Sequence, residues 1–298
     1  MTTEEQFDLT QFQKSNEMDY ILAAKILNSA SNLTEMSNLL YSITRLHVPE
    51  KIYKYISLNS DDNLNQLKFN TLQDNKVFLS CASQLNDPFD SRGYFYKKQE
   101  MAKHPELKRF NGSIIDDFAK YALVCSFSKV GVNNMPMWAH YSNNHSGFCV
   151  EYEPKKNDDL FRGCLFTIQY TDDRIDITQA MDKAITNLLN HKKKSIDDYF
   201  KNVQIELMPI AWITQFLNCV KHSSWSYEKE VRLINSAVST EVSVSRRAIP
   251  SAIYCGYNCS DEHIKELIQI AFTNNIPIYK MIFDEQNPSY ELISYSLD

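Results

Sequence analysis

Glycine is the residue that most restricts what this chain can fold into, because only six of its 298 residues are glycine. No two of these glycines lie closer than 16 positions along the chain. A Rossmann dinucleotide site needs glycines clustered as G-x-G-x-x-G so that the backbone can approach a pyrophosphate, and a P-loop needs a comparable cluster. The sequence contains neither motif. A nucleotide bound by this chain would therefore be held by side chains or helix termini rather than by a glycine-rich loop.

Composition and charge describe a chain that can bury a substantial core. Hydrophobic residues make up 43% of the sequence and charged residues 23%. Acidic residues number 37 against 31 lysines and arginines, and the net charge of −6 weakens the case for a nucleic-acid partner without excluding a local basic groove. The seven cysteines are scattered, mostly inside apolar runs, so we expect them to be reduced core residues of a cytoplasmic protein.

The hydropathy pattern predicts no membrane segment. The first five residues are mostly polar and carry no signal-peptide pattern, and no apolar run reaches the roughly 18 residues of a membrane span. The longest apolar stretch, residues 207–220, is interrupted by polar side chains and predicts a buried helix that is kinked or begins near Pro209. We therefore expect a protein with no membrane partner.

Hydrophobic periodicity predicts the domain organisation. Apolar residues at helical spacing between residues 18 and 46 predict a helical N-terminal extension over 1–48. Residues 49–298 predict a single α+β domain with a helical insertion at about 175–222. Strands are predicted at 52–58, 77–81, 121–128, 148–153, 225–235, 252–256, 278–283 and 290–295, the first two bounded by turns rich in Asn and Asp. Helices are predicted at 110–120, 138–141 and 260–272, with two more between 176 and 221. Ser260 can cap the helix at 260–272, which has acidic residues in its first turn.

The segment WSYEKEVRLI, residues 225–234, carries the most informative pattern. If it is a strand, alternation places Glu228, Glu230 and Arg232 on one face, opposite an aromatic and aliphatic face. Two nearby carboxylates raise the proton affinity of one of them, whereas the arginine favours the charged form. If this face lines a cleft, one carboxylate can stabilise an oxocarbenium-like cation while the other orients a nucleophile. A solvent-facing charged strand fits the same spacing.

The segment SQLNDPFDSR, residues 83–92, follows a predicted strand and has two interpretations. Its proline extends the preceding residue, and the side chains of Asn86, Asp87 and Asp90 can each bond nearby backbone, which predicts a well-formed turn. The functional interpretation is a loop at a strand end that offers its carboxylates and Arg92 to a ligand.

A third segment, residues 138–147, combines aromatic residues with histidines. Trp138 and Tyr141 share a helical face, which could stack on a base or a nicotinamide ring or fill the core. His140 and His145 are five positions apart, a poor helical pairing for a metal, and no cysteine or acid stands beside them at zinc-like spacing. We therefore predict no metal site here.

Four motifs, taken in order, resemble a widespread bacterial family of domains of unknown function. They are YKY at 53–55, LNDPFD at 85–90, WxxY with HxG at 138–147, and WxYExExR at 225–232. The resemblance runs from about residue 52 to residue 283. Members of that family are often associated with phage defence and abortive infection, so the resemblance implies a cytoplasmic bacterial protein of that kind.

The order of these segments also resembles the ADP-ribosyltransferase fold, in particular DNA-modifying ADP-ribosyltransferase toxins. The resemblance implies a mixed, mostly antiparallel split sheet, with NAD as substrate and no metal. It implies that Glu230 holds the nicotinamide ribose and stabilises the oxocarbenium ion, and that Glu228 orients the acceptor. The NAD-binding side chains it implies are Tyr55, Ser80, Asn86, Asp87, Arg92, Trp138, Tyr141, His145 and Arg232. Among these, Tyr55 and Ser80 would line the nicotinamide pocket, and Arg92 or Arg232 would meet the pyrophosphate.

Three functions follow from these patterns. The first is an NAD-dependent ADP-ribosyltransferase-like toxin of anti-phage defence that modifies a nucleic-acid or protein acceptor, restrained by an antitoxin or regulatory partner on the N-terminal helices. The second is a non-catalytic binding or sensing module in which Glu228, Glu230 and Arg232 form a structural ion network. The third is a phosphodiesterase or nuclease that uses the acids around Asp87 and Asp90 with a divalent ion.

Overall fold

The computed structural model describes Lys25, residues 49–104, 122–158, 161, 164–190, 208–236 and 244–297. Within these ranges the chain is a mixed sheet packed with helices, which confirms the predicted α+β class. The predicted N-terminal extension over 1–48, apart from helical Lys25, and the predicted helix at 110–120 lie outside the described residues.

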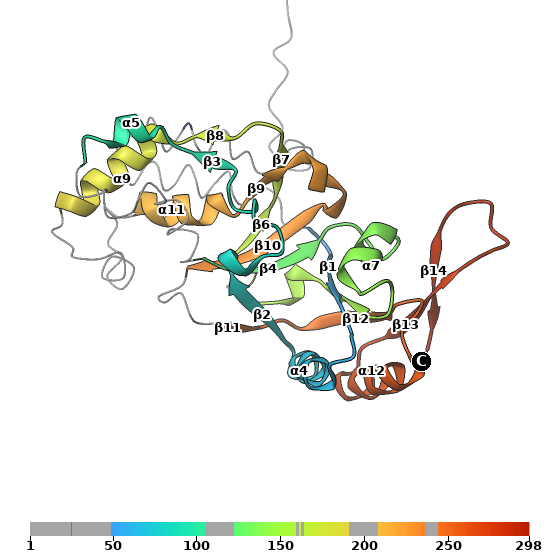
Figure 1. Ribbon diagram of the computed structural model, residues 1–298. Helices are drawn as coiled ribbons and strands as arrows, with labels where there is room; N and C mark the ends of the chain where they lie inside the picture. Colours follow the sequence, from blue (N-terminus) through green and yellow to red (C-terminus); the bar gives the residue numbers. More distant parts are fainter. Residues whose placement is uncertain are drawn as a thin grey trace, which may run out of the picture.

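Ten strands of the described chain form one large sheet (Figure 1). Its main path runs β11-β2-β4-β1-β5-β12-β13-β14, and β10 pairs with β4 and β6. Every pairing in this sheet is antiparallel except β12 with β13. The strands are β1 (Ile52–Ile56), β2 (Lys76–Cys81), β4 (Ala122–Ser128), β5 (Phe148–Tyr152), β6 (Leu165–Thr167), β10 (Glu230–Ser236), β11 (Val244–Arg247), β12 (Pro250–Cys255), β13 (Ile278–Phe283) and β14 (Leu292–Ser296).

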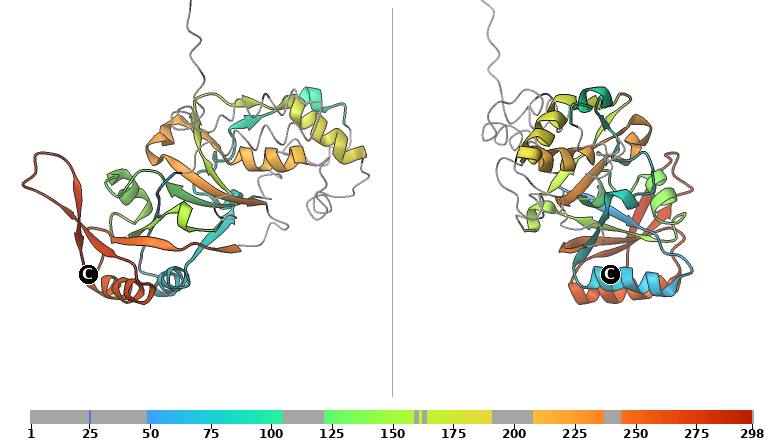
Figure 2. Two further views of the ribbon diagram at one scale, coloured as in Figure 1. Left: turned by 180° about the vertical axis from the view of Figure 1, so that it is seen from behind. Right: turned by 60° about the vertical axis from the view of Figure 1, so that its left-hand side comes forward.

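Two small parallel pairs lie beside the large sheet. They join β3 (Tyr94–Phe95) to β8 (Ile175–Asp176) and β7 (Gln169–Thr171) to β9 (Val220–His222). With the helices α5 (Lys98–Met101), α9 (Thr178–Asn190) and α11 (Met208–Leu217), they form the end of the molecule opposite α4 (Asp62–Gln73) and α12 (Asp261–Asn274) (Figures 1 and 2). The predicted helical insertion therefore contains α9 and α11, together with the short strands β8 and β9.

The large sheet divides at β4. Strand β10 pairs with β4 along its whole length, from Ser128 to Ala122, and so occupies one edge of that strand. The other edge is shared, because β2 pairs at Leu123 and Val124 whereas β1 pairs at Ser128. Between these two pairings the Ser126 carbonyl accepts a hydrogen bond from Nζ of Lys54 at 3.3 Å. Strands β1 and β2 therefore diverge from a common neighbour and leave a split between them.

Helices cover both faces of the sheet. Alternation along β5 sends Phe148 and Val150 into the core beneath α4 and α12, and sends Cys149 to the opposite face. That opposite face is covered by α7 (Met135–Tyr141), whose Trp138 is fully buried. The Ser260 side chain caps α12, as the sequence predicts.

Two predicted segments differ from the structure. Between the predicted strands at 52–58 and 77–81 we expected only turns rich in Asn and Asp, but residues 62–73 form α4, because Asp61 caps its first turn and Phe69 and Leu72 are buried against the core. The expected strand at 225–235 begins only at Glu230, since residues Ser223–Glu228 form the 3₁₀ helix η5. In the part of the chain that is described, no helix combines the length and apolar character that spanning a bilayer requires.

Candidate functional site

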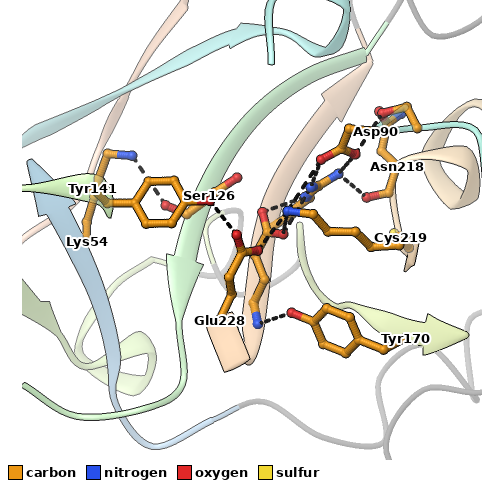
Figure 3. Close-up of polar contacts among 12 residues, drawn as sticks. Lys54, Asp90, Ser126, Tyr141, Tyr170, Asn218, Cys219 and Glu228 are labelled. Carbon is orange, nitrogen blue, oxygen red and sulfur yellow. Dashed lines mark hydrogen bonds and ion pairs between the residues drawn. The ribbon is translucent and has the colours of Figure 1, made fainter. Parts of the chain in front are cut away.

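A pocket of about 140 Å³, which we call the acidic pocket, lies where β1, β4 and β10 meet the loop after β2. Its walls carry the aromatic side chains of Tyr53, Tyr55, Tyr141 and Trp225, and its charged lining consists of Lys54, Asp87, Asp90, Lys221, Glu228, Glu230 and Arg232. We call the five buried charged residues Asp90, Lys221, Glu228, Glu230 and Arg232 the ionic network. This network gathers side chains from β9, η5, β10 and the 85–92 loop, and Figure 3 shows Asp90 and Glu228 of the network with the polar contacts around them.

Arg232 is the centre of the ionic network. Its Nε and Nη2 atoms donate to the two carboxylate oxygens of Glu230 at 2.7 and 3.0 Å, and Nη1 and Nη2 donate to Asp90 at 2.9 and 2.7 Å. The remaining Nη1 hydrogen bond goes to the Asn218 carbonyl at 2.8 Å. All five guanidinium N–H groups are therefore used, on a side chain that is 1% exposed. The expectation that Arg232 meets a pyrophosphate is not supported, because no donor is left for it.

Glu230 is fixed inside the same network. Besides the two bonds from Arg232, its Oε2 atom accepts from Nζ of Lys221 at 3.3 Å. Burial favours a raised pKa, but the positive charges of Arg232 and Lys221 outweigh it, and the pKa of Glu230 is lowered. The solvent-facing interpretation of the acidic segment is therefore wrong, and Glu230 is an ionised, fully paired carboxylate.

Glu228 has a different environment. Its Oε2 atom accepts from Nζ of Lys221 at 2.7 Å and its Oε1 atom accepts from the hydroxyl of Tyr141. Burial and the neighbouring charge of Glu230 raise the pKa of Glu228 above its usual range. Glu228 and Glu230 thus differ in proton affinity. In catalytic pairs of carboxylates, such a difference lets one act as acid or base while the other stays ionised and stabilises charge.

Lys229 explains how these two glutamates come together. It adopts a left-handed conformation, with φ 45°, where η5 ends and β10 begins. Lys229 N–H closes the 3₁₀ turn on the Ser226 carbonyl, and Lys129 N–H donates to the Lys229 carbonyl at 2.9 Å. Glu228 and Glu230 therefore meet across a turn, and not through the strand alternation that the sequence suggested.

The structure places seven of the predicted site residues on this pocket. They are Tyr55, Asn86, Asp87, Tyr141, Glu228, Glu230 and Arg232. Ser80 lines a neighbouring pocket between β1 and β2. Arg92 lines a third pocket, beside residues 171–174, and its Nε atom donates to the Pro88 carbonyl at 3.2 Å. These two residues therefore lie apart from the acidic pocket.

Trp138 and His145 do not line the pocket either. The Trp138 ring is fully buried, and its Nε1 atom donates to the Val132 carbonyl at 2.6 Å. His145 stacks on one side of that ring, with centroids 6.0 Å apart, and the edge contact with Tyr55 has a centroid distance of 5.1 Å. Trp138 was expected either to stack on a ligand or to fill the core. The structure shows it in the core, where its ring packs against the ring of Tyr55.

Two residues that contact the glutamates, Lys221 and Tyr170, were not assigned to the site from the sequence. Lys221 joins Glu228, Glu230 and Asp90, with Nζ also 4.8 Å from the centroid of the Trp225 ring. Tyr170 accepts the Glu230 N–H at 2.8 Å. Their sequence neighbourhoods carry no pattern, because both lie on short strands whose position depends on long-range pairing. Asp90, expected from the sequence to bond nearby backbone or to offer its carboxylate to a ligand or a divalent ion, is instead bound to Arg232.

No cluster of three or more His, Cys, Asp or Glu side chains in the described ranges is arranged to hold a metal ion. The Asp90 carboxylate has both oxygens on Arg232, and Asp87 Oδ1 accepts the Phe89 N–H at 2.8 Å. The positive charge of Arg232 lowers the pKa of Asp90 against the effect of burial. These two acids therefore have structural partners in place of a shared cation.

Comparison with known proteins gives one match. Residues 137–233 match the model of a family described as "Protein of unknown function (DUF2971)". The matched segment includes Tyr141, Lys221, Glu228, Glu230 and Arg232 of the pocket, but neither β1 nor the 85–92 loop. No curated protein and no solved structure matches the chain significantly.

Proposed function

We propose that this chain is an NAD-dependent ADP-ribosyltransferase-like enzyme in which the acidic pocket takes the nicotinamide end of NAD. The observation that carries the proposal is the environment of Glu228. It is a buried carboxylate of raised pKa, held by Tyr141 and Lys221, at the wall of an aromatic pocket. Perturbed carboxylates in a concave, aromatic site are typical of acid–base chemistry.

The electrostatics of the pocket favour a cationic aromatic group. The ionic network contains three carboxylates and two cations, so it carries one net negative charge when all are ionised. Tyrosine and tryptophan rings attract cations through their π faces, most strongly where water is excluded. The nicotinamide of NAD is a positively charged ring, and the sugar gains oxocarbenium character as that ring leaves.

The proposed reaction assigns separate roles to the two glutamates. The N-glycosidic bond of NAD breaks with its electron pair leaving on nicotinamide, which departs neutral. An acceptor oxygen or nitrogen forms the new bond to the ribose carbon, and its proton passes to Glu228. Glu230, with both oxygens occupied, stabilises positive charge at a distance and orients Lys221 and Arg232.

Release of nicotinamide tests this proposal. The full chain is incubated with NAD labelled in the nicotinamide ring, alone and with bacterial extract, oligonucleotides or protein as acceptor. We expect Glu228→Gln to reduce release by about 10²–10⁴-fold, the range for loss of a general base. Glu262→Gln, an exposed glutamate in the first turn of α12, is the matched control. Absence of release with every acceptor would refute the proposal.

A non-catalytic binding module is the second candidate, and the complete pairing of Arg232 favours it. The Arg232 guanidinium uses all five of its N–H groups, and both carboxylate oxygens of Glu230 are bound. Such complete pairing is typical of a structural ion network, in which loss of one partner destabilises the fold. This candidate predicts that the chain binds NAD or a related cation by calorimetry and leaves it intact over hours. The same labelled-NAD experiment therefore separates the two candidates.

The cellular role we propose is anti-phage defence, with a regulatory partner bound to residues 1–48. This part of the proposal is supported by the sequence motifs and concerns residues outside those described. It predicts that expression of the chain lowers cellular NAD and arrests growth in bacteria, and that Glu228→Gln restores both. Growth arrest that persists in the Glu228→Gln variant would contradict it.

A further inference from the structure

A second, larger pocket of about 420 Å³ occupies the split between β1 and β2. Its volume falls within the range of small-molecule sites, which is roughly 300–1,000 Å³. It shares Lys54, Tyr55 and Tyr141 with the acidic pocket, so the two pockets adjoin along β1. We call this second pocket the split pocket.

The split pocket has the opposite charge to its neighbour. Lys54, Lys68 and Lys76 line it, and none of its lining residues is acidic. The Lys68 ammonium donates to the Ser57 carbonyl at 2.7 Å and the Lys54 ammonium to the Ser126 carbonyl, so both have neutral partners there. Lys76 pairs with Asp74 at 2.9 Å, where both side chains are about half exposed. The pocket therefore has positive charge that a bound anion would offset.

The rim of the split pocket is apolar and exposed. Leu64 and Leu67 on α4 are 41% and 52% exposed, and Phe78 on β2 is 41% exposed. All three line the pocket. Alternation along β2 places Lys76, Phe78 and Ser80 on the same, outward side of that strand. An apolar rim with an aromatic ring suits a flat, weakly polar group such as a nucleobase.

We infer that the split pocket binds the ADP portion of a nucleotide, with the phosphates at Lys54 and Lys68 and the base against Phe78 and the α4 leucines. Lysine binds phosphate as a point charge, and the aromatic ring offers a stacking surface. Identification of the whole ligand as NAD rests on the function proposed above. NAD is cationic at the nicotinamide and anionic at the pyrophosphate. These charges complement the acidic pocket and the lysine-lined split pocket, respectively.

Binding of ADP, measured by titration calorimetry at fixed ionic strength, tests this inference without requiring catalysis. Lys68 lines the split pocket and not the acidic pocket, so Lys68→Gln is the informative variant, and Lys265→Gln, exposed on α12, is the matched control. We expect Lys68→Gln to weaken ADP binding at least tenfold and the control to leave it unchanged. We expect Phe78→Ala to weaken ADP binding and to leave the affinity for inorganic pyrophosphate unchanged. Thermal melts establish that each variant is folded.

The outcomes separate this inference from the proposed enzyme activity. ADP binding that depends on Lys68 and Phe78, without nicotinamide release from NAD, would support the split pocket and refute the transferase. Nicotinamide release with the same KM for NAD in wild type and Lys68→Gln would support the transferase and overturn the inference. ADP that fails to bind, or that binds equally well to the Lys68→Gln and Phe78→Ala variants, would also overturn it.

Discussion

Asp90 and Arg232 are 142 residues apart in the sequence and form a two-point ion pair, with Nη1–Oδ1 and Nη2–Oδ2 distances of 2.9 and 2.7 Å. The pair attaches the 85–92 loop to strand β10. A second contact supports it, because the Ser91 hydroxyl donates to Oδ1 of Asn218 at 2.6 Å. The wall of the acidic pocket that carries Asn86 and Asp87 is therefore held in place by buried contacts.

Removal of Asp90 should destabilise the fold strongly. Asp90→Ala leaves Arg232 with one carboxylate fewer in a buried site, and breaking such a pair costs about 3–5 kcal/mol. Urea unfolding measures the change in the free energy of unfolding. Asp87→Ala, in the same loop but only half-buried and outside the ionic network, is the control and should cost less than about 1 kcal/mol. Equal losses in the two variants would show that the ion pair contributes little.

Acid should destabilise the protein through Asp90 and Glu230. Both have pKa values lowered in the folded state, against the effect of burial, by Arg232 and Lys221. Their stabilising contribution is complete above the unfolded pKa values of about 4, and it is lost as the pH falls through the lower folded values. Glu228 has a raised pKa and works in the opposite sense, since its contribution is lost as the pH rises through the folded value.

Urea midpoints measured between pH 7 and pH 3 test this expectation. Wild type should lose stability below about pH 4. Asp90→Ala should lose less over the same interval, because one of the two carboxylates with a lowered pKa is gone. A pH dependence identical in the two proteins would contradict the assignment.

Tyr141→Phe should raise the pKa of Glu228 further. The hydroxyl of Tyr141 donates to the Glu228 carboxylate and so favours its charged form. Carbon-13 NMR of the glutamate carboxyl groups follows this titration, and a transferase would show the same shift in the acid limb of its pH–rate profile. Tyr227→Phe is the control, because its ring neighbours the site while no hydrogen bond from it to Glu228 is seen in the described structure. An unchanged titration in Tyr141→Phe would mean that the hydrogen bond is not formed in solution.

Gly147→Ala should be poorly tolerated. A Cβ at this position would lie 2.0 Å from the carbonyl oxygen of Ile56, which is backbone and cannot rotate away. Overpacking of this kind costs about 1–3 kcal/mol and occasionally more. Gly131→Ala is the matched control, since its nearest neighbour would be the Tyr53 hydroxyl at 3.8 Å. A difference of less than about 0.5 kcal/mol between the variants in thermal or urea unfolding would contradict this prediction.

The sequence predicts the elements whose signals are local. Alternating or continuous apolar runs gave β1, β2, β4, β5, β12 and β13, and the Ser260 cap with acidic residues in the first turn gave α12. Helix α4 could not be found this way, because its polar, asparagine-rich surface hides the two positions, Phe69 and Leu72, that tertiary packing buries. Strands of two or three residues, such as β7 and β9, exist only because distant segments pair.

The candidate site shows the same division. The WxYExExR motif correctly predicts that Glu228, Glu230 and Arg232 belong together. Strand alternation accounts for Glu230 and Arg232, whereas the left-handed conformation of Lys229 brings Glu228 to them. The contribution of Lys221 and Asp90 depends on three-dimensional proximity that no spacing in the sequence reveals. A charged strand in solvent and a buried ionic network have the same one-dimensional pattern, so burial was the missing information.

The ionic network also has a consequence for how the protein is made. Its carboxylates and cations come from the 85–92 loop, from β9 and from the η5–β10 turn, so the residues that close it are synthesised long after Asp90. Until Arg232 has left the ribosome, the nascent chain has no guanidinium to neutralise Asp90 or to position Glu230. The pocket is therefore completed only after residue 232 has left the ribosome, and any activity that depends on it first becomes available after that point.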